Sequence, residues 1–262
     1  MTFKIPPSSL RQRLNRWAKS PAHTGSRTRP LHAIIFFITT LPLFITQPIT
    51  TISNCSSYDH LDYETAKALQ PKVKFVICGL GAGTHYEKWG YTPQQILEKD
   101  WGDKTEVKPD FIIYAEQTHH SSGRGFKRGQ SLWLSFVIQS PTLNIYYSGD
   151  GGYDDRFKRI AEKYKQIDWA IMECGQYNKA WQSVHELPEE VALATTELKA
   201  KNLLPVHHSK FTLAKHTWNE PLKQISKLSQ SKSYKLATPM IGETVRLNDS
   251  TQVFKQWWEN VK

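Results

Sequence analysis

The stretch SNCSSYDHLD (residues 53–62) guides the interpretation of the whole sequence, because it has the form of a metal-binding loop. Asp59 and His60 belong to a pattern in which histidines also stand two and four residues before the aspartate. Those two positions hold Ser57 and Cys55. Since imidazole nitrogens and carboxylate oxygens are common zinc ligands, the loop predicts a metal site that has lost two of its ligands.

The composition describes a globular chain with an uneven charge. Its 262 residues are 39% hydrophobic, which suits one large α/β domain with a substantial core, or two small domains. The net charge is +10, but residues 1–58 carry seven Lys or Arg and no acid, so the remainder holds 27 basic and 24 acidic residues. This nearly neutral remainder argues against a nucleic-acid-binding protein. Three cysteines without a CxxC motif indicate no disulfide framework, and we expect a cytoplasmic protein.

Residues 33–52 (AIIFFITTLPLFITQPITTI) form an uncharged segment that follows a basic one. This order is typical of a signal or membrane anchor, which would make the protein membrane-associated. Unbroken apolarity nevertheless ends near residue 45, short of the roughly 20 residues that a spanning helix needs. A buried or irregular apolar segment and a product of a shifted reading frame are therefore alternatives to the anchor.

From residue 59 onward, apolar strand-like runs alternate with amphipathic helix-like runs. The pattern predicts strands at 73–78, 111–115, 132–139, 143–148, 169–174 and 203–206, and helices at 63–69, 92–98, 156–164, 188–200, 221–228 and 253–261. Strands and helices in alternation indicate an α/β fold in which helices cover sheets.

Polar residues with metal-binding side chains follow several of these strands. His120, Asp150 and His207 each come shortly after a predicted strand. Loops at one edge of the sheet meet in layered α/β folds, so we expect these three to lie near Asp59 and His60. Any one of them taken alone is explained as well by a surface or capping role. Together they favour a divalent metal such as Zn²⁺ in an open, catalytic site.

Seven blocks of sequence, in order, resemble metallo-β-lactamase-fold hydrolases. The branch that they resemble contains N-acylphosphatidylethanolamine-hydrolysing phospholipase D and lactonase-like bacterial relatives. The blocks are YDHLDYET (58–65), GLGAGTHYEKWG (79–90), HSSGRG (120–125), LWLSFVI (132–138), YSGDGGY (147–153), VHELPEE (184–190) and PVHHSKFTLA (205–214).

The resemblance implies a four-layer αββα sandwich that carries two metal ions, usually zinc. Carried over by position, Asp59, His60 and His207 would hold one metal, His120 would hold the other together with histidines at positions 55 and 57, and Asp150 would bridge both. Asp59 and His185 are the implied catalytic residues, and His185 matches a histidine that lines the pocket near the substrate head group. With Cys55 and Ser57 in place, the chain is expected to bind two metals or only one.

The activity implied by the resemblance is hydrolysis of a phosphodiester, or of a lactone-type ester, by a metal-bound hydroxide. The expected substrate is a small molecule, or a phospholipid that would be met at a membrane surface, and no nucleic acid is expected as a partner. The alternative is a catalytically impaired or truncated relative that binds a single metal. Nothing in the sequence indicates the oligomeric state.

The N-terminal part departs from the pattern of the family. Members carry several strands ahead of the metal loop, whereas only 58 residues precede Asp59 here, and none of them is acidic. We therefore expect an atypical segment at 1–57, a hydrolase domain at 58–262, and a first sheet whose N-terminal strands are missing or replaced. We hypothesise that residues 25–57 arose from an upstream reading-frame slip or deletion. A neighbouring frame that encodes strands ending in a His-x-His loop would support this origin.

Overall fold

The computed structural model describes residues 49–53, 56, 60–122, 129–209, 214–259 and 261. The expectations for Cys55, Ser57, Asp59 and most of the segment 1–57 therefore lie outside the described residues. No helix among the residues described is long and apolar enough to cross a membrane. The chain divides into two compact units: unit 1 contains Met1–Asp103 and Ser121–Leu134, and unit 2 contains Lys104–His120 and Ser135–Lys262.

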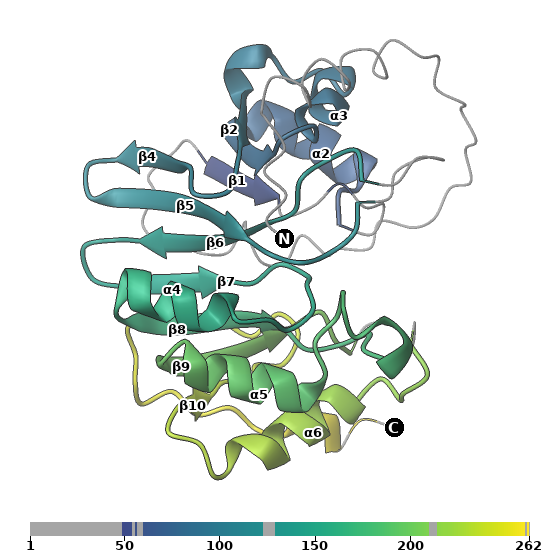
Figure 1. Ribbon diagram of the computed structural model, residues 1–262, viewed down its shortest axis with the longest axis vertical. Helices are drawn as coiled ribbons and strands as arrows, with labels where there is room; N and C mark the ends of the chain where they lie inside the picture. Colours follow the sequence, from purple (N-terminus) through teal and green to yellow (C-terminus); the bar gives the residue numbers. More distant parts are fainter. Residues whose placement is uncertain are drawn as a thin grey trace. The chain divides into compact units, whose positions relative to one another are not determined.

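Unit 1 is built on a parallel three-stranded sheet in the order β1-β2-β3 (Figure 1). The strands are β1 (Ile49–Ser53), β2 (Val73–Gly79) and β3 (Ile96–Lys99), and the helices are α2 (Tyr63–Leu69) and α3 (Gly83–Lys88). The carboxylate of Asp62 caps α2 by accepting from the backbone N–H of Thr65 at 2.9 Å. Val76 and Cys78 of β2 pack with Ala66 and Tyr86 of the helices in the core of this unit.

The prediction of a helix at 92–98 is wrong. Pro93–Gln95 form a single 3-10 turn, and β3 begins at Ile96. The side-chain amide of Gln95 explains the difference, because it donates to the carbonyls of Gln70 and Val73 at 3.1 Å each. These bonds hold the turn against the start of β2, so the chain continues as a neighbouring strand.

Unit 2 contains a seven-stranded sheet in the order β10-β9-β8-β7-β6-β5-β4. Its strands are β4 (Lys104–Lys108), β5 (Phe111–Gln117), β6 (Leu134–Gln139), β7 (Asn144–Tyr147), β8 (Ile167–Glu173), β9 (Ala200–Val206) and β10 (Lys235–Leu236). The expected strands at 132–139 and 143–148 are present as β6 and β7, which pair antiparallel as a hairpin. From β7 to β10 all neighbours pair in parallel. The carboxyl ends of β7, β8 and β9 therefore meet at one edge of the sheet.

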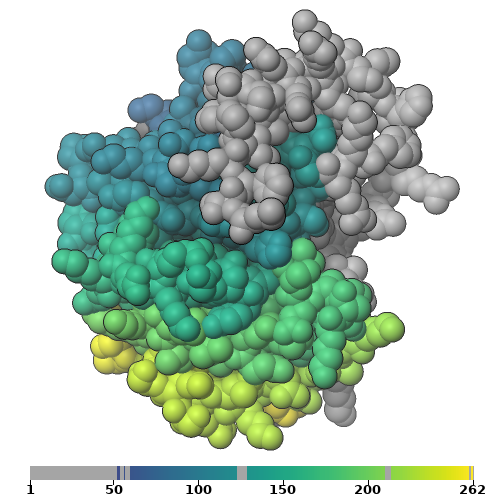
Figure 2. Space-filling view, in the orientation of Figure 1, coloured from purple at the N-terminus to yellow at the C-terminus, as the bar shows by residue number. Residues whose placement is uncertain are grey.

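Three helices cover one face of this sheet: α4 (Arg156–Tyr164), α5 (Pro188–Glu197) and α6 (Glu220–Ser229). Phe157 of α4, Val191 of α5 and Leu222 of α6 are fully buried with Leu203 of β9 in one core. Figure 2 shows this helical face from outside, with α4 in teal-green and α6 in yellow-green. The α/β class expected from the sequence is thus confirmed in both units.

Two of the expected helices end or fold differently. Helix α5 stops at Glu197, because β9 already begins at Ala200. No continuous helix spans 253–261 in the described part of the chain, where only Trp257–Glu259 form a 3-10 turn. Trp258 is almost fully buried in the core of unit 2, and Trp257 stacks on Trp218. Tryptophan packing, rather than an amphipathic helical face, holds this segment.

Candidate metal centre

Three polar groups leave the sheet of unit 2 at the same edge. Asp150 follows β7, Glu173 is the last residue of β8, and His207 follows β9. The strand register places Glu173 opposite Val206, next to His207. Gly175 allows a close approach here, because a Cβ at this position would lie 2.0 Å from the carbonyl oxygen of His207. The parallel sheet therefore gathers these side chains, as the strand-end pattern predicts.

Asp150 lies between two histidines of unit 2. Its Oδ2 is 3.5 Å from Nε2 of His207 and 4.0 Å from Nε2 of His120. The loop that carries Asp150 is fastened to the segment before His120, since the Thr118 hydroxyl donates to the carbonyl of Asp150 at 3.2 Å. The N–H of Gly152 donates to the carbonyl of His119 at 3.0 Å. These bonds fix the distance between Asp150 and His120.

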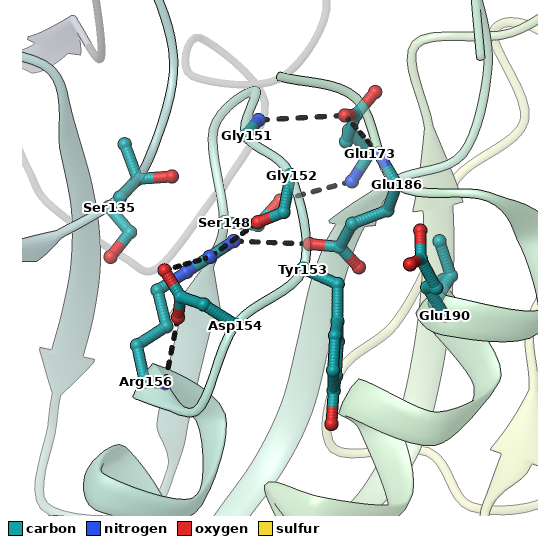
Figure 3. Close-up of polar contacts among 12 residues, drawn as sticks. Ser135, Ser148, Gly151, Gly152, Tyr153, Asp154, Arg156, Glu173, Glu186 and Glu190 are labelled. Carbon is teal, nitrogen blue, oxygen red and sulfur yellow. Dashed lines mark hydrogen bonds and ion pairs between the residues drawn. The ribbon is translucent and has the colours of Figure 1, made fainter. Parts of the chain in front are cut away.

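Glu173 is the central acceptor of the site, and the sequence analysis did not single it out. Its carboxylate is 1% exposed and accepts from Nδ1 of His185 at 3.1 Å and from the N–H of Glu186 at 3.0 Å. Its Oε2 also lies 3.5 Å from Nδ1 of His207. Figure 3 shows the additional bond from the N–H of Gly151 at 3.5 Å. One buried carboxylate thus joins the loops that carry Asp150, His185 and His207.

The hydrogen bonds of His120 and His185 determine which ring nitrogen could bind a metal. A backbone carbonyl can only accept, so Nδ1 of His120 carries the proton in its 3.2 Å bond to the carbonyl of Val184. The carboxylate of Glu173 likewise accepts a hydrogen bond from Nδ1 of His185, so this nitrogen carries the proton. In both rings Nε2 is then the nitrogen with a lone pair for a metal. Such outer partners are the usual means by which a protein orients histidine ligands.

A buried ion pair links the loops that carry Asp150 and His185. Arg156 is 1% exposed and donates to Oε1 of Glu186 at 3.1 Å and to the carbonyl of Gly152 (Figure 3). Burial raises the pKa of Glu186 well above its usual value, and Arg156 partly offsets this rise. The pKa of Arg156 itself is raised, because Tyr146, Glu186 and Asp154 outweigh the lowering by burial. Arg156 therefore stays charged and links the Asp150 loop to the His185 loop.

The neighbouring histidines have different environments. Burial lowers the pKa of His208 to about 4, and its ring nitrogens contact Ser209 and the carbonyl of Pro205. It is therefore a neutral packing residue. His119 is exposed. Burial lowers the pKa of His185, but the carboxylates of Glu173 and Asp150 raise it by more, so the net shift is upward.

Four of the expected site residues come together within unit 2: His120, Asp150, His185 and His207. His60 lies in unit 1, in the turn that precedes α2. Asp59 lies outside the described residues. Two clusters of possible ligand atoms lie within unit 2. In one, atoms of His120, Asp150 and His185 lie within 4.8 Å of one another. In the other, atoms of Glu173, His185 and His207 do so.

The residues of unit 2 fit a divalent metal. Zinc bonds to imidazole nitrogen and carboxylate oxygen at about 2.0–2.2 Å, so tetrahedral ligands stand roughly 3.4 Å apart. The 3.5 Å between His207 and Asp150 matches this spacing, and the 4.0 Å between His120 and Asp150 requires only a small inward movement. Neutral imidazoles with one carboxylate form a donor set that zinc and related divalent ions prefer.

Comparisons with known proteins agree with this geometry. The family model of the beta-lactamase superfamily domain matches residues 51–208. An uncharacterised protein of Mycobacterium tuberculosis is 32% identical over 206 residues, which cover 77% of this chain and 55% of that protein. The mitochondrial N-acyl-phosphatidylethanolamine-hydrolyzing phospholipase D of Saccharomyces cerevisiae is 31% identical over 224 residues, 79% of this chain and 47% of the relative. The chain thus spans about half the length of these curated relatives.

A solved structure shares the fold. The metallo hydrolase from the archaeon Ignicoccus hospitalis superposes with a TM-score of 0.60 at 18% sequence identity. The match covers 75% of this chain and 78% of the archaeal one. At this identity the likeness concerns the fold alone.

Proposed function

Because the chain belongs to the metallo-β-lactamase superfamily, we propose that it is a metal-dependent hydrolase that cleaves a phosphodiester bond of a phospholipid. The yeast relative, an N-acyl-phosphatidylethanolamine-hydrolyzing phospholipase D, supports this substrate class. A lactone-type ester is the other substrate that the sequence resemblance implies. A phospholipid substrate would be met at a membrane surface.

The observation that carries the proposal is that His120 and His207 converge on Asp150. The other ring nitrogen of His120 bonds to the carbonyl of Val184, and that of His207 lies beside the buried carboxylate of Glu173. Asp150, His120 and His207 would hold metal, and Asp59 and His60 are the further ligands that the sequence resemblance implies. We propose zinc as the ion, since the ligands are imidazoles and carboxylates. A divalent ion bound there supplies a Lewis acid that polarises a phosphoryl oxygen and lowers the pKa of water.

The chain itself supplies orientation. Glu173 holds the ring of His185, and it lies beside the ring of His207. The ion pair of Arg156 with Glu186 holds the loop of Asp150 against the loop of His185. Asp59 is proposed both as a ligand and as a catalytic carboxylate. Preorganised groups of this kind accelerate a reaction because they need not rearrange as charge develops.

An impaired enzyme that binds one metal is the second candidate function, and the sequence at positions 55 and 57 favours it. Cys55 can ligate zinc as a thiolate, but Ser57 is a poor ligand. The double variant Cys55→His with Ser57→His restores the full motif. If it binds one more zinc per chain and hydrolyses faster than wild type, the natural chain is the impaired form.

The full chain should be assayed on vesicles that contain N-acylphosphatidylethanolamine, in parallel with a simple lactone. We expect zinc-dependent release of phosphatidic acid, and at least about a 100-fold loss in Asp150→Asn, since loss of an outer partner alone costs roughly 10–100-fold. The exposed His119→Gln is the matched control and should keep wild-type activity. Hydrolysis of the lactone alone would replace the proposed substrate, and hydrolysis that survives a chelator would refute the proposal.

A further inference from the structure

We propose that His185 is a metal ligand in this chain and that it forms a three-ligand site with His120 and Asp150. The site would compensate for the two histidines that are replaced by Cys55 and Ser57. This inference rests on the proposed function, and it assigns to His185 a role other than that of lining the pocket. All three ligands belong to unit 2.

The first argument is distance and ring orientation. Possible ligand atoms of His120, Asp150 and His185 lie within 4.8 Å of one another. The rings of His120 and His185 are 5.3 Å apart between centroids and cross at 70°. Crossed rings can direct one nitrogen each towards a common point. By contrast, the rings of His185 and His207 are nearly parallel, with 9° between their planes and 5.7 Å between their centroids.

The second argument is the tautomer of His185. Both carboxylate oxygens of Glu173 lie 3.1 Å from Nδ1 of this ring. The N–H of Glu186 donates to Oε1 of the same carboxylate, so the acceptor is itself fixed. A buried carboxylate that holds one ring nitrogen, and so leaves the other for the ion, is the usual support of a metal-binding histidine.

The third argument is that one loop orients both histidines. The carbonyl of Val184 accepts the Nδ1 proton of His120, and His185 is the next residue of the chain. The loop is held in turn by the ion pair of Arg156 with Glu186. Movement of this loop would therefore displace both ligands together, which is the coupling expected of a shared site.

Two neutral imidazoles and one carboxylate leave a zinc ion with an open position. This number of protein ligands is typical of catalytic rather than structural zinc sites. The three ligands do not include any residue at 55–60. The metal ion held by His120 would thus have three protein ligands, His120, Asp150 and His185. Without His185 it would have only His120 and Asp150.

The test is the zinc affinity of the full chain, measured by competition with a chromophoric chelator. We expect His185→Gln to weaken one zinc site by about 100-fold or more, since even outer partners contribute about 10–100-fold. The exposed His119→Gln is the control for adventitious binding and should match wild type. Zinc affinity within twofold of wild type in a folded His185→Gln protein would overturn the inference, even if hydrolysis were lost.

A second measurement does not depend on a folded variant. Anomalous diffraction from zinc-loaded crystals of the wild-type chain should place an ion at bonding distance from Nε2 of His185. An ion bound by His120 and Asp150 but distant from His185 would contradict the inference. The proposed function is judged separately: a chain whose zinc depends on His185 but that cleaves no phosphodiester refutes the function alone.

Discussion

The carboxylate of Glu173 accepts a hydrogen bond from Nδ1 of His185, with each oxygen 3.1 Å from the nitrogen. The carboxylate is buried in unit 2 with 1% of its side chain exposed, and the His185 side chain is 15% exposed. A charged acceptor in such a position gives a stronger bond than a neutral one. It also fixes the ring that we assign to the metal.

Replacing Glu173 with Gln should weaken zinc binding by about 10–100-fold, the usual effect of losing an outer carboxylate. Gln keeps an oxygen that can accept from the N–H of Glu186, so the fold should be retained. Chelator competition measures the affinity. Glu162→Gln on the exposed side of α4 is the control, and equal affinities in the two variants would contradict this role of Glu173.

Replacing Arg156 with Met should lower the free energy of unfolding by about 3–5 kcal/mol, because it leaves the buried Glu186 unpaired. The double variant Arg156→Met with Glu186→Gln should recover part of this loss. Urea denaturation of the full chain provides the measurement. The matched control is Arg159→Met, whose partner Asp155 is exposed, and it should cost about 0–1 kcal/mol. Similar losses of unfolding free energy in Arg156→Met and Arg159→Met would contradict the view that the buried pair of Arg156 with Glu186 stabilises the fold.

Asp168 should stabilise unit 2 at neutral pH, and this stabilisation should be lost in acid. Burial raises the pKa of this carboxyl, but bonds from the N–H of Asn144, from Lys201 and from Gln166 lower it by more, so the net shift is downward. Its contribution is therefore complete above the unfolded pKa of about 3.9 and is lost as the pH falls through the lower folded pKa. Asp168→Asn should cost about 1.5–3 kcal/mol at pH 7, the range for hydrogen bonds to a charged group.

The difference between Asp168→Asn and wild type should shrink as the pH falls below about 4, because protonation removes the same charge from the wild-type residue. Unfolding free energies at several pH values test this. Asp155→Asn, at a largely exposed position, should show little difference at any pH. A cost for Asp168→Asn that is constant from neutral to acid pH would contradict the predicted direction.

Adding a methyl group at Gly151 should disturb the metal centre without a change of charge. A Cβ there would lie 2.2 Å from Oγ1 of Thr118, too close for a real contact. We expect Gly151→Ala to displace Asp150 and to weaken zinc binding by about 10-fold or more. Wild-type zinc affinity in Gly151→Ala would show that the close packing is not required.

Much of the fold could be predicted because several of its strands are largely buried. The run Ile167–Glu173 is buried throughout, and such apolar runs are recognised easily in a sequence. Lys104–Lys108 was missed because this edge strand is half exposed and carries charges that interrupt an apolar run. The helix expected at 92–98 failed because contacts of Gln95 with residues distant in the sequence decide its structure.

The site was predicted to a similar extent. Asp150 and His207 could be found because they follow apolar strands, where the loops of an α/β sheet gather ligands. Glu173 was missed because it was taken as part of a strand, although a single acid at the end of an otherwise apolar strand is an identifiable signal. Its contact with His185 depends on how the strand and the later loop pack together, which no local pattern in the sequence reveals.

The most direct test of the central claim is the zinc content of the purified full chain, measured beside its phosphodiesterase activity. We predict at least one zinc per wild-type chain. Asp150→Asn should lose both the bound zinc and the activity, and a chelator should abolish wild-type hydrolysis until zinc is returned. A wild-type chain that retains no divalent metal after zinc loading, or that hydrolyses equally well with and without it, would contradict the claim that this is a metal-dependent hydrolase.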